Sequence, residues 1–266
     1  MAVLFAVLAL IGGALLAATK KRLTLVQGFS VSLPDTMPRV RSSFALIRGI
    51  GLAGIVRALG DRAWSTNISF GLACDLARVP PARPTAVAVH MRETDEKTFT
   101  GFHAERERVA GDDYMEIDQR LRMCASCVVV LYCAFDPEGA PIFAQWLINS
   151  RTQFRLRRMT HGQFPELSES EVLAEGGYTF VDFRRLGAMG EGLRQVLCIA
   201  RENGAERCVT FVTVDNLASL RGVANAGFEL EHVRATVSRL GRRRVIRRAP
   251  TPEERTLWEQ AITPRT

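Results

Sequence analysis

The sequence predicts an α/β protein with a mixed central sheet and flanking helices, preceded by an N-terminal membrane helix. Strand-like and helix-like stretches alternate between residues 178 and 225, and two apolar, β-branched runs flank a turn near residue 138. The membrane helix is expected because residues 2–18 contain no charged side chain. A chain of 266 residues, 47% of them hydrophobic and 24% charged, also excludes a disordered protein, a collagen-like repeat and a small disulfide scaffold.

Residues 1–19 are expected to be a transmembrane anchor. A helix over the uncharged run reaches roughly 25 Å, which suits a thin hydrocarbon core. Lys20, Lys21 and Arg22 follow the run instead of preceding it, which is the reverse of a secretory signal. The positive-inside rule then places the C-terminal domain of a single-pass protein in the cytoplasm. A cleaved signal and a buried soluble helix are the alternatives.

Residues 20–84 are expected to form a basic juxtamembrane helical segment and a linker. The ten Lys and Arg residues and three Asp residues between positions 20 and 85 account for the whole net charge of +7. Such a stretch is attracted to anionic lipids, so residues 1–64 are expected to contact membrane lipids. The apolar residues between 44 and 59 suit an interfacial helix or a helix packed on the next domain. The Pro-rich stretch 79–84 reads as the linker.

The main domain is expected over residues 85–248, with residues 249–266 as a C-terminal tail. The apolar runs predict strands at Thr85–Met91, Cys127–Phe135, Ile142–Ile148, Tyr178–Phe183 and Cys208–Val214, and a hairpin of Phe228–Leu240 with Arg242–Arg248. Helices are predicted at Glu93–Val109, Glu191–Glu202 and Leu217–Asn225. Arg151–Glu175 has no clear periodicity and is expected to form loops. The strand, helix, strand order after residue 178 requires a crossover, so the sheet is partly parallel there.

A glycine-containing turn, Arg184–Gly190, connects one predicted strand to the next helix. Such a turn presents unpaired backbone N–H groups at a helix N-terminus, which suits a phosphate. The turn has neither the dinucleotide GxGxxG pattern nor the Walker Gly-Lys-Ser/Thr pattern. Its sequence context is therefore needed to identify the ligand.

The context extends from Tyr178 to Glu229. The turn with Arg184, Gly187 and Met189 is followed by a helix that ends at Gly204, then by a strand, by Asn216 and Ser219, and by Gly227 and Phe228. This order and spacing resembles the acyl-CoA-binding half of the GNAT superfamily of N-acyltransferases. A weaker resemblance extends back to the strand predicted at Thr85–Met91, which is enough for one complete GNAT-like domain.

The resemblance implies acetyl-CoA or another acyl-CoA as the co-substrate. Pantetheine would pair with the edge of the strand that ends near Asp182 and Phe183, where it splays from the strand at Phe211–Val214. The residues that would bind the co-substrate are Phe183, Arg184, Leu186, Gly187, Ala188, Met189, Gly190, Asn216 and Ser219, and the backbone amides of residues 186–190 would hold its pyrophosphate.

Two residues depart from the pattern. Met189 replaces the last small residue of the turn, although Gly190 follows it. Val223 occupies the position where many members carry a tyrosine that protonates the leaving thiolate. The expected function is therefore a membrane-anchored N-acyltransferase that transfers an acyl group, most simply acetyl, to an amine of a small or membrane-associated acceptor. A non-catalytic acyl-CoA-binding sensor or scaffold, and an enzyme for longer acyl chains, are the alternatives.

The candidate general bases are Asp182 and Glu175, because carboxylates near a strand end can accept a proton directly or through water. No metal is expected, since the Cys124-Ala-Ser-Cys127 pair has no second cysteine or histidine pair to complete a site. No nucleic-acid partner is expected either, because no aromatic residues are interleaved with the arginines of 242–248. The sequence does not identify the amine acceptor.

Overall fold

The computed structural model describes residues 64–94, 96–125, 130–160, 162, 164–240 and 242–263. The predicted anchor at residues 1–19, and residues 20–63 of the predicted basic segment, lie outside these ranges. No helix within the described ranges is both long enough and apolar enough to cross a bilayer.

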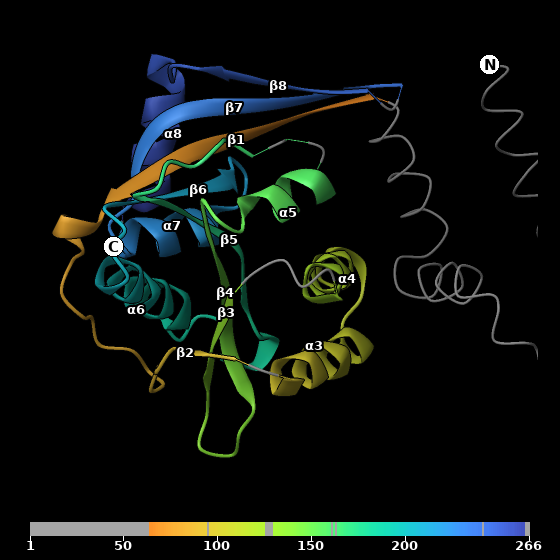
Figure 1. Ribbon diagram of the computed structural model, residues 1–266, viewed down its shortest axis with the longest axis vertical. Helices are drawn as coiled ribbons and strands as arrows, with labels where there is room; N and C mark the ends of the chain where they lie inside the picture. Colours follow the sequence, from red (N-terminus) through yellow and green to blue (C-terminus); the bar gives the residue numbers. More distant parts are fainter. Residues whose placement is uncertain are drawn as a thin grey trace, which may run out of the picture. The chain divides into compact units, whose positions relative to one another are not determined.

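The described residues form one sheet of eight strands in the order β2-β3-β4-β5-β6-β1-β7-β8 (Figure 1). The strands are β1 (Trp64–Asp75), β2 (Arg92–Glu93), β3 (Val130–Phe135), β4 (Pro141–Asn149), β5 (Glu171–Thr179), β6 (Arg207–Thr213), β7 (Glu229–Arg239) and β8 (Arg242–Arg248). β5 and β6 are parallel, and every other neighbouring pair is antiparallel. The predicted mixed sheet is confirmed.

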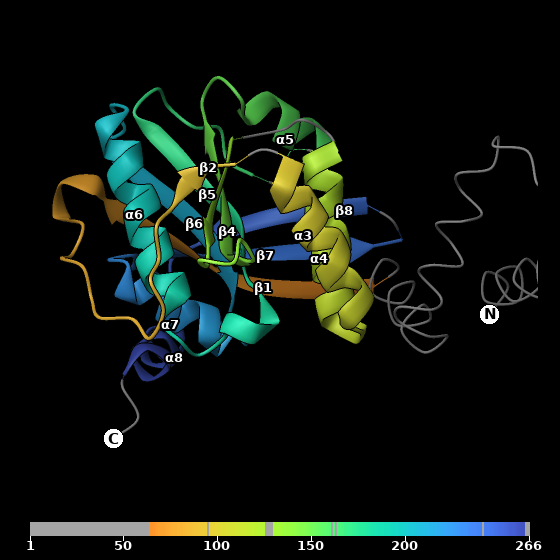
Figure 2. The same ribbon diagram turned by 90° about the horizontal axis from the view of Figure 1, so that it is seen from below.

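Helices cover both faces of this sheet (Figure 2). The helices are α3 (Glu96–Arg108), α4 (Gly111–Ala125), α5 (Gln153–Met159), α6 (Ala188–Glu202), α7 (Leu217–Asn225) and α8 (Pro252–Ile262). Residues of α6, α7 and α8 share one apolar core with β1 and β6. Residues of α3, α4 and α5 share a second core with β3 and β4, on the opposite face.

Several predicted elements are confirmed. The apolar runs around the turn at residue 138 pair as the antiparallel hairpin β3–β4, and β7–β8 is the second predicted hairpin. The predicted helices correspond to α3, α6 and α7. Gly204 follows α6 with a φ of 86°, the left-handed conformation that glycine adopts without steric cost.

The N-terminal boundary predicted at residue 85 is wrong, because β1 lies inside the sheet between β6 and β7. Its first residues, Trp64 to Asn67, are mostly exposed and polar, so no apolar alternation reveals a strand. Residues 85–91 are not a strand. Their backbone is held by other groups instead: Ala86 N donates to Leu186 O, while the Gln195 side chain bonds Val89 O and Met91 N.

The C-terminal segment 249–266 is not only a tail, because α8 packs against the sheet. Thr251 and Glu254 form a reciprocal capping box, in which each side chain accepts from the other residue's backbone N–H, and Pro252 occupies the first turn. Trp258 is buried edge-on against Phe70 of β1, with 6.1 Å between ring centroids.

The strand predicted at Tyr178–Phe183 begins earlier in the structure. β5 starts at Glu171, and Val181–Phe183 forms the 3-10 turn η3 instead. The prediction failed because Gly176 and Gly177 suggest a loop, whereas in the structure they form a bulge within β5 opposite Gln145. The expectation of loops at Arg151–Glu175 is also wrong, because this range contains α5 and the first residues of β5.

Candidate active site

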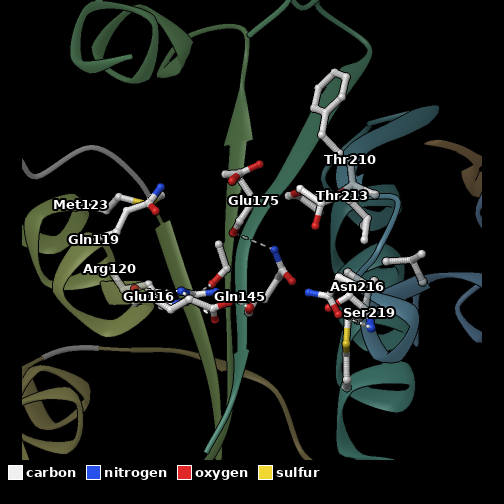
Figure 3. Close-up of a pocket in the computed structure, with 18 residues that line it drawn as sticks. Glu116, Gln119, Arg120, Met123, Gln145, Glu175, Thr210, Thr213, Asn216 and Ser219 are labelled. Carbon is white, nitrogen blue, oxygen red and sulfur yellow. Dashed lines mark hydrogen bonds and ion pairs between the residues drawn. The ribbon is translucent and has the colours of Figure 1, made fainter. Parts of the chain in front are cut away.

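A cleft opens where β5 and β6 separate. The two strands pair only through residues 171–173 of β5 and 207–209 of β6. Thr210 Oγ1 then donates to Ala174 O at 2.8 Å, and beyond this bond the strands diverge. The cleft has a volume of about 270 Å³ and is lined by residues of α4, β4, β5, α6, β6 and α7 (Figure 3). The predicted splay between these two strands is present, and it begins after the last paired residues, Leu173 and Val209.

The β5 bulge forms one wall of the cleft and needs both of its glycines. Gly176 has a φ of 69°, and a Cβ there would lie 2.8 Å from the Trp146 ring. A Cβ on Gly177 would lie 2.6 Å from Gln145 Oε1. The Gln145 amide donates to Glu175 O at 2.8 Å, which fixes the backbone just before the bulge (Figure 3).

Arg120 of α4 also fixes the β5 bulge, through two hydrogen bonds to its carbonyl groups. Its Nε donates to Gly176 O at 2.8 Å and its Nη2 donates to Gly177 O at 2.7 Å. The guanidinium also lies 5.0 Å from the centre of the Tyr178 ring. Burial lowers its pKa, while the nearby Glu116 and Glu175 carboxylates favour the charged form. Arg120 therefore positions Glu175 and the backbone that faces the cleft.

Glu175 is the predicted base that the structure places in the cleft. Burial raises the pKa of its carboxyl, and the opposing effects of Arg234, Arg120 and a backbone hydrogen bond from Gly176 are smaller. A carboxyl whose pKa moves toward neutrality is better matched to general base catalysis near pH 7. Glu175 thus has both the place and the environment of a proton acceptor.

Asp182 does not reach the cleft. It lies on η3 with an exposed carboxylate, which pairs with Arg108 at 2.9 Å. The hydrogen bond from Arg108 lowers the pKa of Asp182, so the group is a weaker base than a free aspartate. The structure therefore separates the two residues that the sequence suggested as bases.

The predicted phosphate turn precedes α6 as expected. Gly187 caps the helix with a φ of 82°, and Arg185 is also left-handed, with a φ of 66°. Glu191 N donates to Gly187 O at 3.3 Å, the first bond of the helix, so the earlier N–H groups have no acceptor within α6. Leu186 to Gly190 can thus present backbone amides to a phosphate. Arg184 instead pairs with Asp113 of α4 at 2.7 Å, and Phe183 packs among apolar neighbours.

Met189 and Gly190 serve the contact between α6 and α7. A Cβ on Gly190 would lie 3.3 Å from Asn225 Cβ, so this glycine permits the helices to approach and is not spare room for phosphate. The Met189 sulfur lies 2.6 Å from the place where a Gly222 Cβ would be, and Met189 also lines the cleft. Met189 therefore fills space against a glycine on α7.

Asn216 and Ser219 line the cleft at the start of α7 (Figure 3). Asn216 caps the helix by accepting from Ser219 N at 3.0 Å. Val223 lines the cleft one turn later and offers no proton. Tyr178 cannot replace the missing tyrosine there, because its hydroxyl is buried on the α3 side near Glu105 and Arg184.

Sequence reasoning missed Arg120, Gln145 and Arg234. Arg120 belongs to α4, which was not predicted, and Gln145 lies within a strand expected to be only apolar core. One available signal was the Gly176-Gly177 pair beside a carboxylate, since glycines within a strand often mark a bulge. Within the described ranges, no three His, Cys, Asp or Glu side chains are grouped closely enough to hold a metal ion.

Replacing Gly187 by valine should weaken acetyl-CoA binding by about tenfold or more. A β-branched residue cannot adopt a φ of 82° without strain of about 1–3 kcal/mol, so the turn and its amides must move. Calorimetry measures the change. Gly204→Val is the matched control, because Gly204 has a φ of 86° at the other end of the same helix, with open space around it. Equal affinities in the wild type and the Gly187 variant would contradict the phosphate assignment.

No family model and no curated protein matches the chain. The chain is similar to the solved structure of a GNAT-family acetyltransferase from Colwellia psychrerythraea, with 13% identity over 78% of this chain and 75% of that chain, and a TM-score of 0.44. It is also similar to a GCN5-related N-acetyltransferase from Sphaerobacter thermophilus, with 13% identity over 71% of this chain and 57% of that chain, and a TM-score of 0.41.

A third similar structure is a GCN5-related glucosamine N-acetyltransferase region of a fungal multi-domain β-N-acetylglucosaminidase, with 12% identity, a TM-score of 0.48, and coverage of 78% of this chain and 24% of that chain. The chain spans less than two thirds of the length of the Sphaerobacter and fungal proteins. At this level of identity and superposition, the similarity does not establish a reaction or a substrate, which must be argued from the cleft.

Proposed function

We propose that the protein is an N-acyltransferase that moves an acyl group, most simply acetyl, from acyl-CoA to an amine. The observation that carries this proposal is the cleft between β5 and β6, whose wall contains the Glu175 carboxylate and Met189 of the first turn of α6, where the backbone amides have no acceptor within the helix. The amides suit the CoA pyrophosphate, and the unpaired edge of β5 suits the amide groups of pantetheine.

Glu175 supplies the proton chemistry in this proposal. Its carboxylate removes a proton from the acceptor ammonium, directly or through water, so that the free amine attacks the thioester carbonyl. A carbon–nitrogen bond forms, and the tetrahedral intermediate then loses its second nitrogen proton to water as the carbon–sulfur bond breaks. Because Val223 has no ionisable group, the departing thiolate takes its proton from water in the open cleft. Ser219 and Asn216 line the cleft, and in this proposal they contact the thioester end of the co-substrate.

A non-catalytic acyl-CoA-binding module is the second candidate, and Val223 is the observation in its favour. The two functions differ in thiol release from acetyl-CoA mixed with a panel of amines, after binding has been shown by calorimetry. The transferase predicts thiol release that requires an amine. Tight binding without turnover for acetyl-CoA and for medium and long acyl-CoA would favour the module. A preference for longer acyl chains would instead support an N-acyltransferase that uses long-chain acyl-CoA and makes lipid-like products.

We also propose that the protein is a single-pass membrane protein, with residues 1–64 in contact with lipid and the C-terminal domain in the cytoplasm. The described part of the chain supports lipid contact at the end of the sheet where β1 begins and where β7 turns into β8 (Figure 1). Trp64 and Leu240 lie together there and are 68% and 82% exposed. Arg239 stacks on Trp64 at 4.1 Å, and the edge strand β8 adds arginines that suit anionic lipid headgroups.

Trp64 should therefore be quenched by brominated lipids when the full chain is bound to vesicles that contain anionic lipid. The other two tryptophans, Trp146 and Trp258, are buried and should be quenched little. Trp64→Phe should remove most of the quenching without releasing the protein. Equal quenching in the wild type and the variant would contradict lipid contact at this end of the sheet.

A further inference from the structure

The face of the sheet beside Glu175 contains an unusual group of buried nitrogens without partners. Among the described residues, four buried side-chain polar atoms have no hydrogen-bond partner, and three of these belong to His232 and Arg234 of β7. They are His232 Nε2 and Arg234 Nε and Nη1. Because nearly all buried polar atoms in native proteins are paired, such a concentration marks a place where a ligand or an ordered water supplies the missing partner.

The Arg234 guanidinium lies against the wall of the cleft. It stacks on the Phe211 ring at 4.0 Å, and the Phe164 ring lies 5.3 Å away. Phe211 itself lines the cleft. The His232 ring meets the edge of Phe211, with 5.8 Å between ring centroids. Stacking of this kind fixes the plane of a guanidinium while leaving its N–H edges free for an oxyanion.

Arg234 and Glu175 also interact electrostatically. The register of the sheet places Arg234 opposite Ser69 of β1, and Ser69 opposite Thr213, which lines the cleft. Burial lowers the pKa of Arg234, the nearby Glu175 carboxylate partly offsets this by favouring the charged form, and Arg247 on β8 lowers the pKa further. A cation and a carboxylate therefore stand on the same side of the sheet at the point where an acceptor would meet the thioester.

We propose that the acceptor is an amine that also carries a carboxylate or phosphate, and that Arg234 binds this anionic group while the amine lies at Glu175. The inference rests on the proposed N-acyltransferase function, which it makes more specific. A zwitterionic acceptor complements the site because its ammonium faces the Glu175 carboxylate and its oxyanion faces the free N–H edges of Arg234. A simple alkylamine complements only the Glu175 carboxylate and supplies no anionic group for Arg234.

The test compares ω-amino carboxylates of increasing length, from glycine to 5-aminopentanoate, with their neutral amides, and includes O-phosphoethanolamine. In the wild type, kcat/KM for the best carboxylate or phosphate should exceed that of its neutral counterpart by at least about tenfold. A factor of ten corresponds to about 1.4 kcal/mol of binding free energy. Arg234→Met should reduce this ratio to about one, and Arg234→Lys should retain part of it. Arg243→Gln, which removes an exposed arginine of β8, should leave the ratio unchanged.

Two further readouts distinguish the inference from its premise. Calorimetry measures binding of the N-acetylated amino acid to the CoA-loaded protein, and this binding should depend on Arg234. If the binding depends on Arg234 but no amine is acylated, the transferase is rejected and the anion site is kept. Acylation of acids and amides at equal rates, or a ratio that Arg234→Met does not change, would overturn the inference and keep the transferase. The melting temperature of Arg234→Met should equal or exceed that of the wild type, because the variant removes two buried guanidinium nitrogens that have no hydrogen-bond partner. A large fall would indicate a structural role instead.

Discussion

Glu175→Gln is expected to lower kcat by about 10² to 10⁴ while leaving the dissociation constant of acetyl-CoA unchanged. Glutamine keeps the size of the side chain and its place in the cleft wall, but it cannot accept a proton. The thiol-release assay measures kcat, and calorimetry measures binding. Asp182→Asn is the matched control, because Asp182 is an exposed carboxylate paired with Arg108 outside the cleft. Loss of activity in the Asp182 variant, with a fully active Glu175 variant, would reverse the assignment.

The pH dependence follows from the environment of Glu175. Burial raises the pKa of its carboxyl, so kcat/KM of the wild type should rise with pH around a value above the ordinary carboxyl range. The raised pKa also means that ionisation destabilises the fold, so this contribution to stability is lost as pH rises through the folded-state pKa. Glu175→Gln should therefore melt near the wild-type temperature below about pH 4 and above it at neutral pH.

Arg120→Met is expected to lower the free energy of unfolding by about 3 kcal/mol or more. The substitution removes two charge-assisted hydrogen bonds to Gly176 O and Gly177 O, each worth about 1.5–3 kcal/mol, and leaves both carbonyls unpaired. Because these carbonyls belong to the bulge beside Glu175, acetyl-CoA binding should weaken as well. Chemical denaturation gives the first quantity and calorimetry the second.

Arg122→Met provides the control for this effect on the same helix. Arg122 is exposed and pairs with Asp118 at the surface, and such a pair contributes about 0–1 kcal/mol. A similar loss of stability in the two variants would show that the bulge does not depend on Arg120. A stable Arg120 variant with normal acetyl-CoA binding would refute its positioning role.

The sequence predicted the second half of the fold better than the first. Between residues 188 and 248, helices and strands have strong periodicity and clear ends, such as the left-handed Gly204 and the Asn216 cap. β1 escaped prediction because its outer half is polar and its stability comes from pairing on both edges. Such pairing depends on residues far away in the sequence, which local patterns cannot reveal.

The candidate site was predicted in part. The turn before α6, Asn216 and Ser219 follow a local pattern, so the resemblance located them. Glu175 was named as a base, but no local pattern favours it over Asp182, since only the bulge decides which carboxylate faces the cleft. Arg234 becomes informative only when β7 is folded beside β1 and β6, because its neighbours Phe211, Phe164 and Glu175 come from other elements.

The position of β1 between β6 and β7 has a consequence for the order in which the protein folds. The first described strand to leave the ribosome has its nearest partner 132 residues later, where Asp75 pairs with Arg207, and its other partner begins at Glu229. Loop closure over such a sequence separation is slow, so β1 remains unpaired while the segments that form α3 to α6 are synthesised. The sheet can be completed only after β7 has emerged, and within the described domain the cleft beside β6 is therefore one of the last features to form.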